Sequence, residues 1–468
     1  MAVSPELEGL RRIAPSRFVS FAFPNPFLGH ASNPYGGGDD GDAGECVRVA
    51  VLDSPLPAPP VPATAAMLVP TGRHRDWIFS TRAGHLHLLL SATRFSRLIL
   101  VGPELSAPSP RVVSCARRRP DPDPALARLL PLLLALCPMA AFRGNAVPDV
   151  PLLTFQDDLL RLAPIEFVAG PVVGEMVVED VAVDCSPSRP AELRRRLRFK
   201  RMPCLVQTQV RLRQSHASPS LSLSLSLEAL EGSSGELLQP EVGGPLAQPY
   251  LQAMVAGLAV TAPSIEKSIQ SGARPRCLCA GVGGGSLLMS LRVGLQFDVL
   301  GIEADGVVLD VARSHFGLVE DEFLRVHVGD AIQTIEGFAA GQGEPGMNFS
   351  AVMVDLDSSD AMCGVSAPPL EMSRGSVLLS VRTILDHHGV LILNVIPPPA
   401  DKTFYKAVTD LLRQFFSELY EIDVGNGENF VLVATVSPVE TTATGDPGQF
   451  LTDLRNSAGD FLERIRKI

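Results

Sequence analysis

Charged residues make up only 19% of the 468-residue sequence, and basic residues are the minority among them. The chain has 40 Lys and Arg against 51 Asp and Glu, so its formal net charge is −11. A general nucleic-acid binder needs a basic face to meet the phosphates, and this balance leaves little charge for one. We therefore expect no nucleic-acid partner, while an acidic balance alone selects no particular protein partner.

The sequence also lacks paired cysteine motifs. Its eight cysteines are scattered, at positions 46, 115, 137, 185, 204, 277, 279 and 363, and no two of them form a CxxC element. Cys277 and Cys279 lie within an apolar run, unlike the ligands of a zinc knuckle. We expect no metal site, and reduced thiols in a cytoplasmic protein.

No hydrophobic run is long enough to cross a membrane. The most apolar stretch, residues 125–142, is interrupted by Arg128, Pro131 and Pro138, whereas a span needs about 20 apolar residues. We expect a buried helix there, broken at Pro131. The N-terminus contains arginines and serines but also two glutamates, and it has no secretory apolar core. Neither a membrane partner nor a transit peptide is therefore favoured.

Composition divides the first half of the chain into three segments. Residues 1–46 end in a Gly/Asp-rich stretch and are predicted to form a flexible arm. Short apolar runs over residues 47–214, residues 76–80 among them, predict a β-rich domain. Residues 215–245 contain a Ser/Leu tract of low complexity. Its strict alternation would suit a strand, but its composition favours a poorly ordered linker.

The second half alternates between strand-like and helix-like patterns. In residues 246–440, helical patterns separate apolar runs at residues 276–280, 297–302, 324–327, 351–354 and 389–395. This order predicts an α/β fold with a doubly wound parallel sheet and a ligand crevice at the carboxyl ends of its strands. Residues 441–468 are predicted to end the chain in an amphipathic helix.

The first of these strands runs directly into a glycine-rich turn, Ala-Gly-Val-Gly-Gly-Gly-Ser at residues 280–286. Gly281, Gly283 and Gly285 are candidate cofactor-binding residues, because a tight turn and a close approach of the ligand both require glycine. The helix from Ser286 would offer free N–H groups to the ligand. A dinucleotide fingerprint would place its third glycine at 286, so the spacing favours a nucleoside-methionine ligand over a pyrophosphate.

Acidic residues follow the next three strands. Glu303 ends the second strand and is placed to accept both ribose hydroxyls. Asp330, followed by Ala331, comes where a carboxylate can accept the adenine amino group, and Asp355 should project into the crevice beside the cofactor. One such acid alone could be a solvated strand end. Four features in this order instead predict a site for S-adenosylmethionine.

Residues 47–440 resemble the C-terminal half of the methyltransferase-like protein 13 family, the lysine and N-terminal methyltransferases of elongation factor 1 alpha. The resemblance is carried by short motifs in both halves of the chain, in the same order. They lie at residues 75–81 (RDWIFST), 178–181 (VEDV), 199, 206–207, 281–286, 303–305, 326–330 (VHVGD), 354–360 (VDLDSSD), 368–369 and 391–394 (LILN).

This resemblance implies a class I methyltransferase fold of the spermidine-synthase-like type, preceded by a smaller β-rich domain. It also implies S-adenosylmethionine as the cofactor and elongation factor 1 alpha as a partner. The family's separate N-terminal domain has no counterpart here, so its lysine-methylating activity is not carried over. The C-terminal half is associated with methylating the N-terminal amine of the factor.

Methyl transfer to an amine requires a positioned, deprotonated nucleophile. An α-amino group has a pKa of ~8 against ~10.4 for lysine, so it needs little help from a general base. We expect Asp355 and Asn394 to hold the amine, with Asp357 as a weaker catalytic candidate. A turn residue is an equally good interpretation of Asn394.

Three other functions remain open. An aminopropyltransferase of polyamine biosynthesis would share the fold, but polyamine synthases tend to carry Glu where this chain has Ala253. A non-catalytic scaffold would have had no reason to keep the glycines and all three acids. An NAD oxidoreductase comes last, because Ser286 interrupts its fingerprint. The sequence does not distinguish a monomer from a homodimer.

Overall fold

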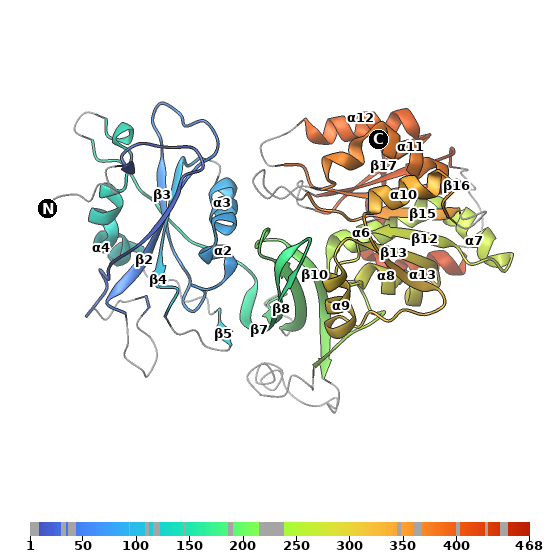
Figure 1. Ribbon diagram of the computed structural model, residues 1–468, viewed down its shortest axis with the longest axis horizontal. Helices are drawn as coiled ribbons and strands as arrows, with labels where there is room; N and C mark the ends of the chain where they lie inside the picture. Colours follow the sequence, from blue (N-terminus) through green and yellow to red (C-terminus); the bar gives the residue numbers. More distant parts are fainter. Residues whose placement is uncertain are drawn as a thin grey trace.

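The computed structural model shows a chain built around three β-sheets, with the second sheet lying between the first and the third (Figure 1). The structure describes residues 9–29, 34–35, 44–92, 94–107, 112–115, 122–143, 146–185, 191–214, 238–343, 348–358, 367–398, 403–425, 429–439 and 448–468.

The first sheet has five strands in the order β1-β2-β4-β3-β6. These strands span β1 Phe18–Pro24, β2 Cys46–Asp53, β3 Thr64–Leu68, β4 Arg97–Pro103 and β6 Leu152–Leu153. The middle strands β2 and β4 are buried along nearly their whole length, which is why they read as continuous apolar runs. Helices α3 (Arg82–Ser91) and α4 (Pro122–Ala135) accompany this sheet.

The prediction of a flexible arm over residues 1–46 is wrong for its middle part. Strand β1 pairs with β2 along seven residues, from Phe18 opposite Leu52 to Pro24 opposite Cys46. A buried ion pair holds the segment before it, because Arg97 Nε donates to Asp53 Oδ1 (2.7 Å) while its Nη1 donates to the carbonyl of Leu10 (2.6 Å). The Gly/Asp-rich stretch at residues 36–43 lies outside the described residues.

Residues 76–80 also differ from the prediction, since they form a helix and not a strand. The Asp76 side chain accepts a hydrogen bond from the amide of Ile78 and so caps α2 (Trp77–Ser80). This apolar run is too short for the spacing of its hydrophobic residues to distinguish a helix from a strand. Helix α4 likewise continues through Pro131, where we expected a break.

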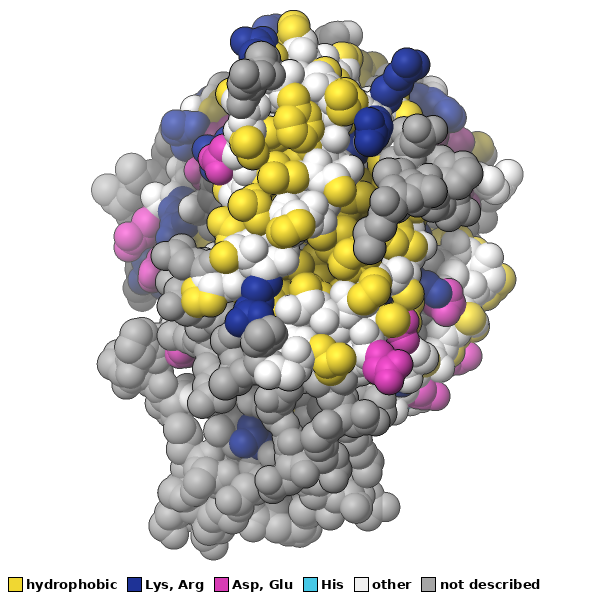
Figure 2. Space-filling view, turned by 90° about the vertical axis from the view of Figure 1, so that its left-hand side faces the viewer, with side chains coloured by type: hydrophobic (Ala, Val, Ile, Leu, Met, Phe, Trp, Pro, Cys, Tyr) yellow, Lys and Arg dark blue, Asp and Glu magenta, His cyan; other side chains and the backbone are white. Residues whose placement is uncertain are grey.

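Hydrophobic side chains gather on the outer face of this first part, at the end of the molecule where α4 and the N-terminus lie (Figure 2). The exposed apolar side chains of this first part of the chain include Leu28, Leu130 and Met139. Across the described ranges, no helix is both long and apolar enough to span a bilayer. The described residues also contain no group of three His, Cys, Asp or Glu side chains that could hold a metal ion.

The second sheet is antiparallel, in the order β11-β10-β9-β8-β7-β5. Its strands are β5 Val113–Ser114, β7 Leu159–Gly170, β8 Gly174–Val183, β9 Glu192–Phe199, β10 Val206–Gln214 and β11 Leu238–Pro240. Residues 47–214, which we predicted as one β-rich domain, thus contribute strands to two sheets. Strand β11 falls within the predicted linker, while the Ser/Leu tract at 215–237 lies outside the described residues.

The third sheet has the order β14-β13-β12-β15-β16-β18-β17-β19. The strands from β14 to β16 pair in parallel, as predicted, and β18 runs antiparallel to both of its neighbours. Their bounds are β12 Arg276–Ala280, β13 Asp298–Glu303, β14 Leu324–Val328, β15 Phe349–Val354, β16 Leu385–Val395, β17 Glu418–Asp423, β18 Phe430–Thr435 and β19 Arg466–Lys467.

Helices cover both faces of this third sheet. Alternate residues of β12 point into different cores: Cys277 and Cys279 into one, Leu278 and Ala280 into the other. The first core includes residues of α6 (Pro249–Ala256), α7 (Ala262–Gln270), α9 (Gly306–His315) and α13 (Gln449–Ala458). The second includes residues of α10 (Ala331–Ala339), α11 (Gly375–Ile384) and α12 (Phe404–Phe415).

The predicted C-terminal amphipathic helix is shorter than expected. Helix α13 ends at Ala458, and Gly459 has a φ of 55°, which a helix cannot continue. The chain then forms a 3₁₀ turn over Gly459–Arg464 and adds β19 beside β17.

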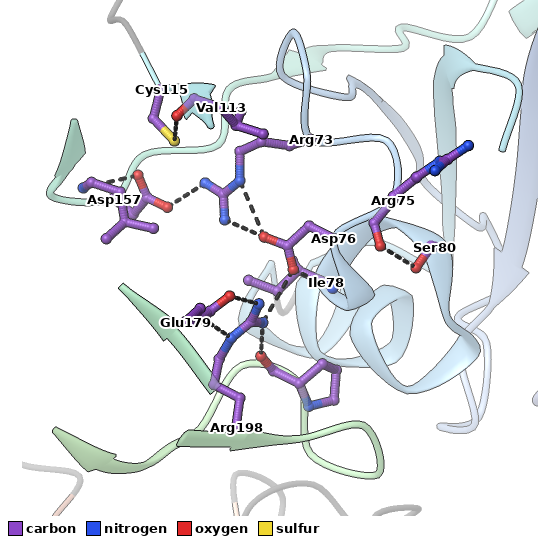
Figure 3. A network of polar contacts seen from close by, with 12 residues as sticks. Arg73, Arg75, Asp76, Ile78, Ser80, Val113, Cys115, Asp157, Glu179 and Arg198 are labelled. Atoms are coloured by element: carbon purple, nitrogen blue, oxygen red, sulfur yellow. Dashed lines mark hydrogen bonds and ion pairs between the residues drawn. The ribbon is translucent and has the colours of Figure 1, made fainter. Parts of the chain in front are cut away.

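Buried ion pairs join the first part to the second sheet (Figure 3). Arg198 of β9 donates from Nε to Glu179 Oε1 (2.6 Å) and from Nη1 to Asp76 Oδ1 (3.1 Å). Arg73 donates to the other oxygen of Asp76 (2.7 Å), and Arg196 pairs with Glu179. Burial alone would raise the pKa of Asp76, but Arg198 and Arg73 hold it below its usual value. Each buried charge is therefore compensated.

We predict that Arg198→Met destabilises the protein by about 3–5 kcal/mol, because it leaves two buried carboxylates without their shared partner. Urea unfolding at neutral pH measures this loss. The matched Arg455→Met, at an exposed position on α13, should change stability by less than about 0.5 kcal/mol. Equal losses in the two variants would contradict the assigned role of Arg198.

Candidate functional site

The functional residues predicted from the sequence meet at one edge of the third sheet. Ala280 at the end of β12 lies opposite Ile302 of β13 and Val354 of β15, and Glu303 lies opposite Val328 of β14. Because these strands are parallel, their carboxyl ends share this edge. The chain leaves β12 toward β13 on one side and returns to β15 on the other, so a topological switch point lies between β12 and β15.

The glycine loop follows β12 and makes the predicted turn. Gly281, Gly283 and Gly285 all have positive φ, at 89°, 53° and 80°. At Gly281 the need for glycine comes from the protein and not from a ligand, because a Cβ there would collide with the carbonyl of Asp355. This backbone-to-backbone approach brings the glycine loop against the start of the loop that follows β15.

We predicted free N–H groups at the helix from Ser286; the amides of the glycine loop that precedes this helix are paired within the protein. The amides of Val282 and Gly283 donate to Glu303 Oε2 (both 3.2 Å), that of Gly284 donates to Thr208 Oγ1 (2.7 Å), and that of Gly285 donates to the carbonyl of Val282 (2.9 Å). Helix α8 (Ser286–Met289) has only one turn before a π-helical segment. Four consecutive loop amides are therefore already bonded within the protein, and the free N–H groups expected at the helix itself stay a prediction.

Glu303 is 8% exposed and connects the ends of β12 and β13. Besides the two loop amides, its Oε1 accepts from the amide of Asp305 (3.1 Å). Burial raises the pKa of Glu303, and these three amide donors oppose the rise. A carboxylate offers about four acceptor positions, which leaves room for about one further donor such as a ribose hydroxyl.

Asp330 and Ala331 lie at the start of α10, one strand further along the edge. Asp330 caps this helix, with Oδ1 accepting from the amide of Gln333 (2.9 Å), and its carboxylate is exposed. Ala331 is buried against the sheet. The cap fixes the orientation of Asp330, which is a property that a binding carboxylate at this edge requires.

Asp355 is held by two side chains at the switch point. Tyr250 of α6 donates its hydroxyl to Oδ2 (3.0 Å), and Asn394 of β16 donates from Nδ2 to Oδ1 (3.0 Å). Desolvation raises the pKa of Asp355 to about 6, while the two donors act against the shift. The pKa of Tyr250 is raised well above its usual value by burial and by Asp355, so Tyr250 remains a donor.

Asn394 contributes an open acceptor beside this carboxylate. It lies within β16, which excludes the turn interpretation, and it is only 4% exposed. Its Nδ2 is committed to Asp355, and among the described residues no donor reaches its buried Oδ1. Buried amide oxygens are nearly always paired, so this atom is suited to receive a hydrogen bond from a bound molecule.

Asp357 is bonded to residues of the second sheet, and its charge helps to raise the pKa of Asp355. Arg201, in the turn between β9 and β10, donates from Nη2 to both carboxylate oxygens (3.0 and 3.2 Å). Gln207 of β10 donates to Oδ2 (3.2 Å), and Arg201 Nη1 also donates to the carbonyl of Ser358 (3.1 Å). Asp357 is thus an anchor between the second sheet and the loop after β15.

Sequence reasoning missed Tyr250, Arg201, Gln207 and Thr208. Tyr250 carried a usable signal, because it is one of only four tyrosines and lies in the first turn of α6, the first helix after the predicted linker. The other three lie 72 or more residues before the glycine loop, and only the packing of the second sheet on the third brings them to it.

No protein-family model matches the chain. It is 29% identical over 406 residues to the eEF1A lysine and N-terminal methyltransferase of Danio rerio, and 28% identical over 416 residues to that of Homo sapiens. Both alignments cover 86% of this chain, and they cover 54% and 56% of the two relatives. A homologue from Drosophila melanogaster is 25% identical over 350 residues.

Two solved structures are also similar. The crystal structure of human methyltransferase-like protein 13 in complex with SAH has 29% sequence identity and a TM-score of 0.39, covering 45% of this chain and 93% of that one. A probable spermidine synthase from Corynebacterium glutamicum has 12% identity and a TM-score of 0.41, covering 65% and 91%. By sequence, the chain matches the eEF1A lysine and N-terminal methyltransferases along most of its own length and spans about half the length of these relatives.

Proposed function

We propose that the protein is an S-adenosylmethionine-dependent methyltransferase that methylates the N-terminal amine of elongation factor 1 alpha. The observation that carries this proposal is the hydrogen-bonded group of Tyr250, Asp355 and Asn394. It places two acceptors, the Asp355 carboxylate and Asn394 Oδ1, at the switch point beside the glycine loop and Glu303. The names of the similar proteins, eEF1A lysine and N-terminal methyltransferases, support both the reaction and the substrate.

The residues at the sheet edge fit this cofactor. Glu303 has room for a hydroxyl donor, Asp330 presents an exposed carboxylate one strand further along, and the glycine loop lies on the other side of Glu303 at the end of β12. S-adenosylmethionine would supply the electrophilic methyl group of its sulfonium. The role of this chain is then to hold the methyl-accepting amine in line with that methyl group.

The acceptor amine is best held by the two oxygens at the switch point. Asn394 Oδ1 and the Asp355 carboxylate can each accept one N–H, which aims the nitrogen lone pair away from them. An α-amino group with a pKa of ~8 needs only a weak acceptor for its proton. Asp355, with its pKa of about 6, can take that proton without a stronger base.

The contacts of Asp357 weigh against a polyamine synthase. A diamine acceptor needs an additional anionic group for its far ammonium, and Asp357, two residues after Asp355, is already paired with Arg201. Ala253 is fully buried in the core and offers no such group. We therefore assign this site to a single amine.

Labelling from tritiated S-adenosylmethionine tests the proposal directly. The full chain is incubated with recombinant elongation factor 1 alpha from which the initiator methionine has been removed, and in parallel with putrescine and decarboxylated cofactor. We expect label only in the N-terminal peptide of the factor. Label in lysine peptides alone, or product only in the putrescine reaction, would overturn the proposal.

We predict that Asp355→Asn reduces methyl transfer at least ~100-fold, because the side chain no longer accepts a proton and its amide must face the Tyr250 or Asn394 donor. Binding of S-adenosylhomocysteine, measured by calorimetry, should change less than about threefold, since Glu303 and the glycine loop are intact. The control is Asp460→Asn, at an exposed acid that is not part of the hydrogen-bonded group around Asp355. Undiminished turnover by Asp355→Asn would remove Asp355 from the mechanism.

The pH dependence provides a second prediction. The productive state needs a neutral amine and an ionised Asp355. Between pH of about 6 and ~8 only the amine must lose a proton, so log kcat/KM should rise with a slope of about one. Below pH of about 6 both groups must lose a proton, so the slope should be about two. The logarithmic plot should therefore steepen near pH 6. In Asp357→Asn the change of slope should move to a lower pH, because the charge of Asp357 helps to raise the pKa of Asp355. A single slope through pH 6 in the native enzyme would count against this role.

A further inference from the structure

Thr208 of β10 lies directly against the glycine loop. It is 4% exposed, and its hydroxyl oxygen accepts the hydrogen bond from the amide of Gly284. A Cβ on Gly283 would lie 2.8 Å from Thr208 Oγ1, and one on Gly284 would collide with Thr208 Cγ2. Two glycines of the loop are therefore required by Thr208, which belongs to a different sheet from the strand that carries the loop.

A β-bulge places this side chain. In the pairing of β10 with β9, Val206 lies opposite Arg198 and Thr208 opposite Leu197, so Gln207 is an extra residue on β10. Consecutive side chains of a regular strand point to opposite faces. The bulge changes this local alternation, and Gln207 reaches Asp357 while its neighbour Thr208 reaches Gly284. Bulges commonly re-aim side chains beside functional sites.

The glycine loop is thereby held from two sides. Glu303 binds the amides of Val282 and Gly283 from the third sheet, and Thr208 binds the amide of Gly284 from the second. Gly284 is buried, so its amide has no access to solvent once Thr208 is removed as a partner. Loss of the hydroxyl would leave an unpaired buried N–H, and the loop would have to move to hydrate it.

We propose that Thr208 is a positioning residue for the cofactor: by fixing Gly284 it keeps the glycine loop, and with it the Glu303 carboxylate, in the geometry that binds the nucleoside. This inference rests on the proposed function, since it concerns the same cofactor. It assigns to the second sheet a part in cofactor affinity, in addition to its contact with the acceptor side through Gln207 and Arg201.

The test is a pair of substitutions in the full chain. Thr208→Val keeps the branched shape and removes the hydroxyl, whereas Thr208→Ser keeps the hydroxyl and removes the methyl group. Because one hydrogen bond of this kind is involved, we expect Thr208→Val to weaken the binding of S-adenosylhomocysteine about fivefold, measured by calorimetry. Thr208→Ser should bind within about twofold of the native protein. In turnover, Thr208→Val should raise the KM for S-adenosylmethionine and change kcat little.

Thr435→Val is the matched control. Thr435 lies on β18, is 1% exposed, and its hydroxyl has no partner among the described residues. This variant should bind S-adenosylhomocysteine like the native protein, and thermal unfolding of each variant verifies that it is folded. Unchanged or tighter binding by Thr208→Val, or equal weakening by Thr208→Ser, would overturn the inference. Absence of binding by the native protein would instead overturn the proposed function.

Discussion

Strand β12 has parallel partners on both sides, β13 and β15, and this pairing is the constraint on which the site depends. Parallel strands end at the same edge, so residues as far apart in sequence as Gly281, Glu303 and Asp355 become neighbours there. Backbone hydrogen bonds continue past the strand ends, from Gly281 to Ile302 and from Asp355 to Ala280. The loops that carry the functional groups therefore begin from fixed positions.

The second sheet connects the two ends of the molecule through side chains of β9 and of the turn that follows it. Arg198 near the end of β9 reaches Asp76 in the first part, and Arg201, only three residues later, reaches Asp357 in the third. Both contacts pair an arginine with a carboxylate, but they lie in different surroundings. The first is buried and charge-balanced, so it is costly to break, whereas the second is partly exposed and is weakened by solvent.

Sequence alone was sufficient for the features that repeat along the chain. The parallel strands of the third sheet were visible as apolar runs, and so were the acidic residues after β13, β14 and β15, because strand period and strand end are local properties. The same reasoning failed where local patterns were short or ambiguous. Residues 76–80 form a helix because Asp76 caps it, and β1 is ordered because β2 pairs with it. Tyr250, Gln207 and Thr208 acquire their roles only through packing between distant segments.

The contact between Thr208 and Gly284 also has an evolutionary consequence. A glycine in a cofactor loop is commonly read as a record of the ligand that the loop accommodates. Here the space beside Gly284 is filled by a threonine methyl group from another sheet. Positions 208 and 284 are therefore expected to change together among related proteins, with a larger residue at 284 accompanied by a smaller one at 208. Conservation of this glycine would then report on how the two sheets dock as much as on the cofactor.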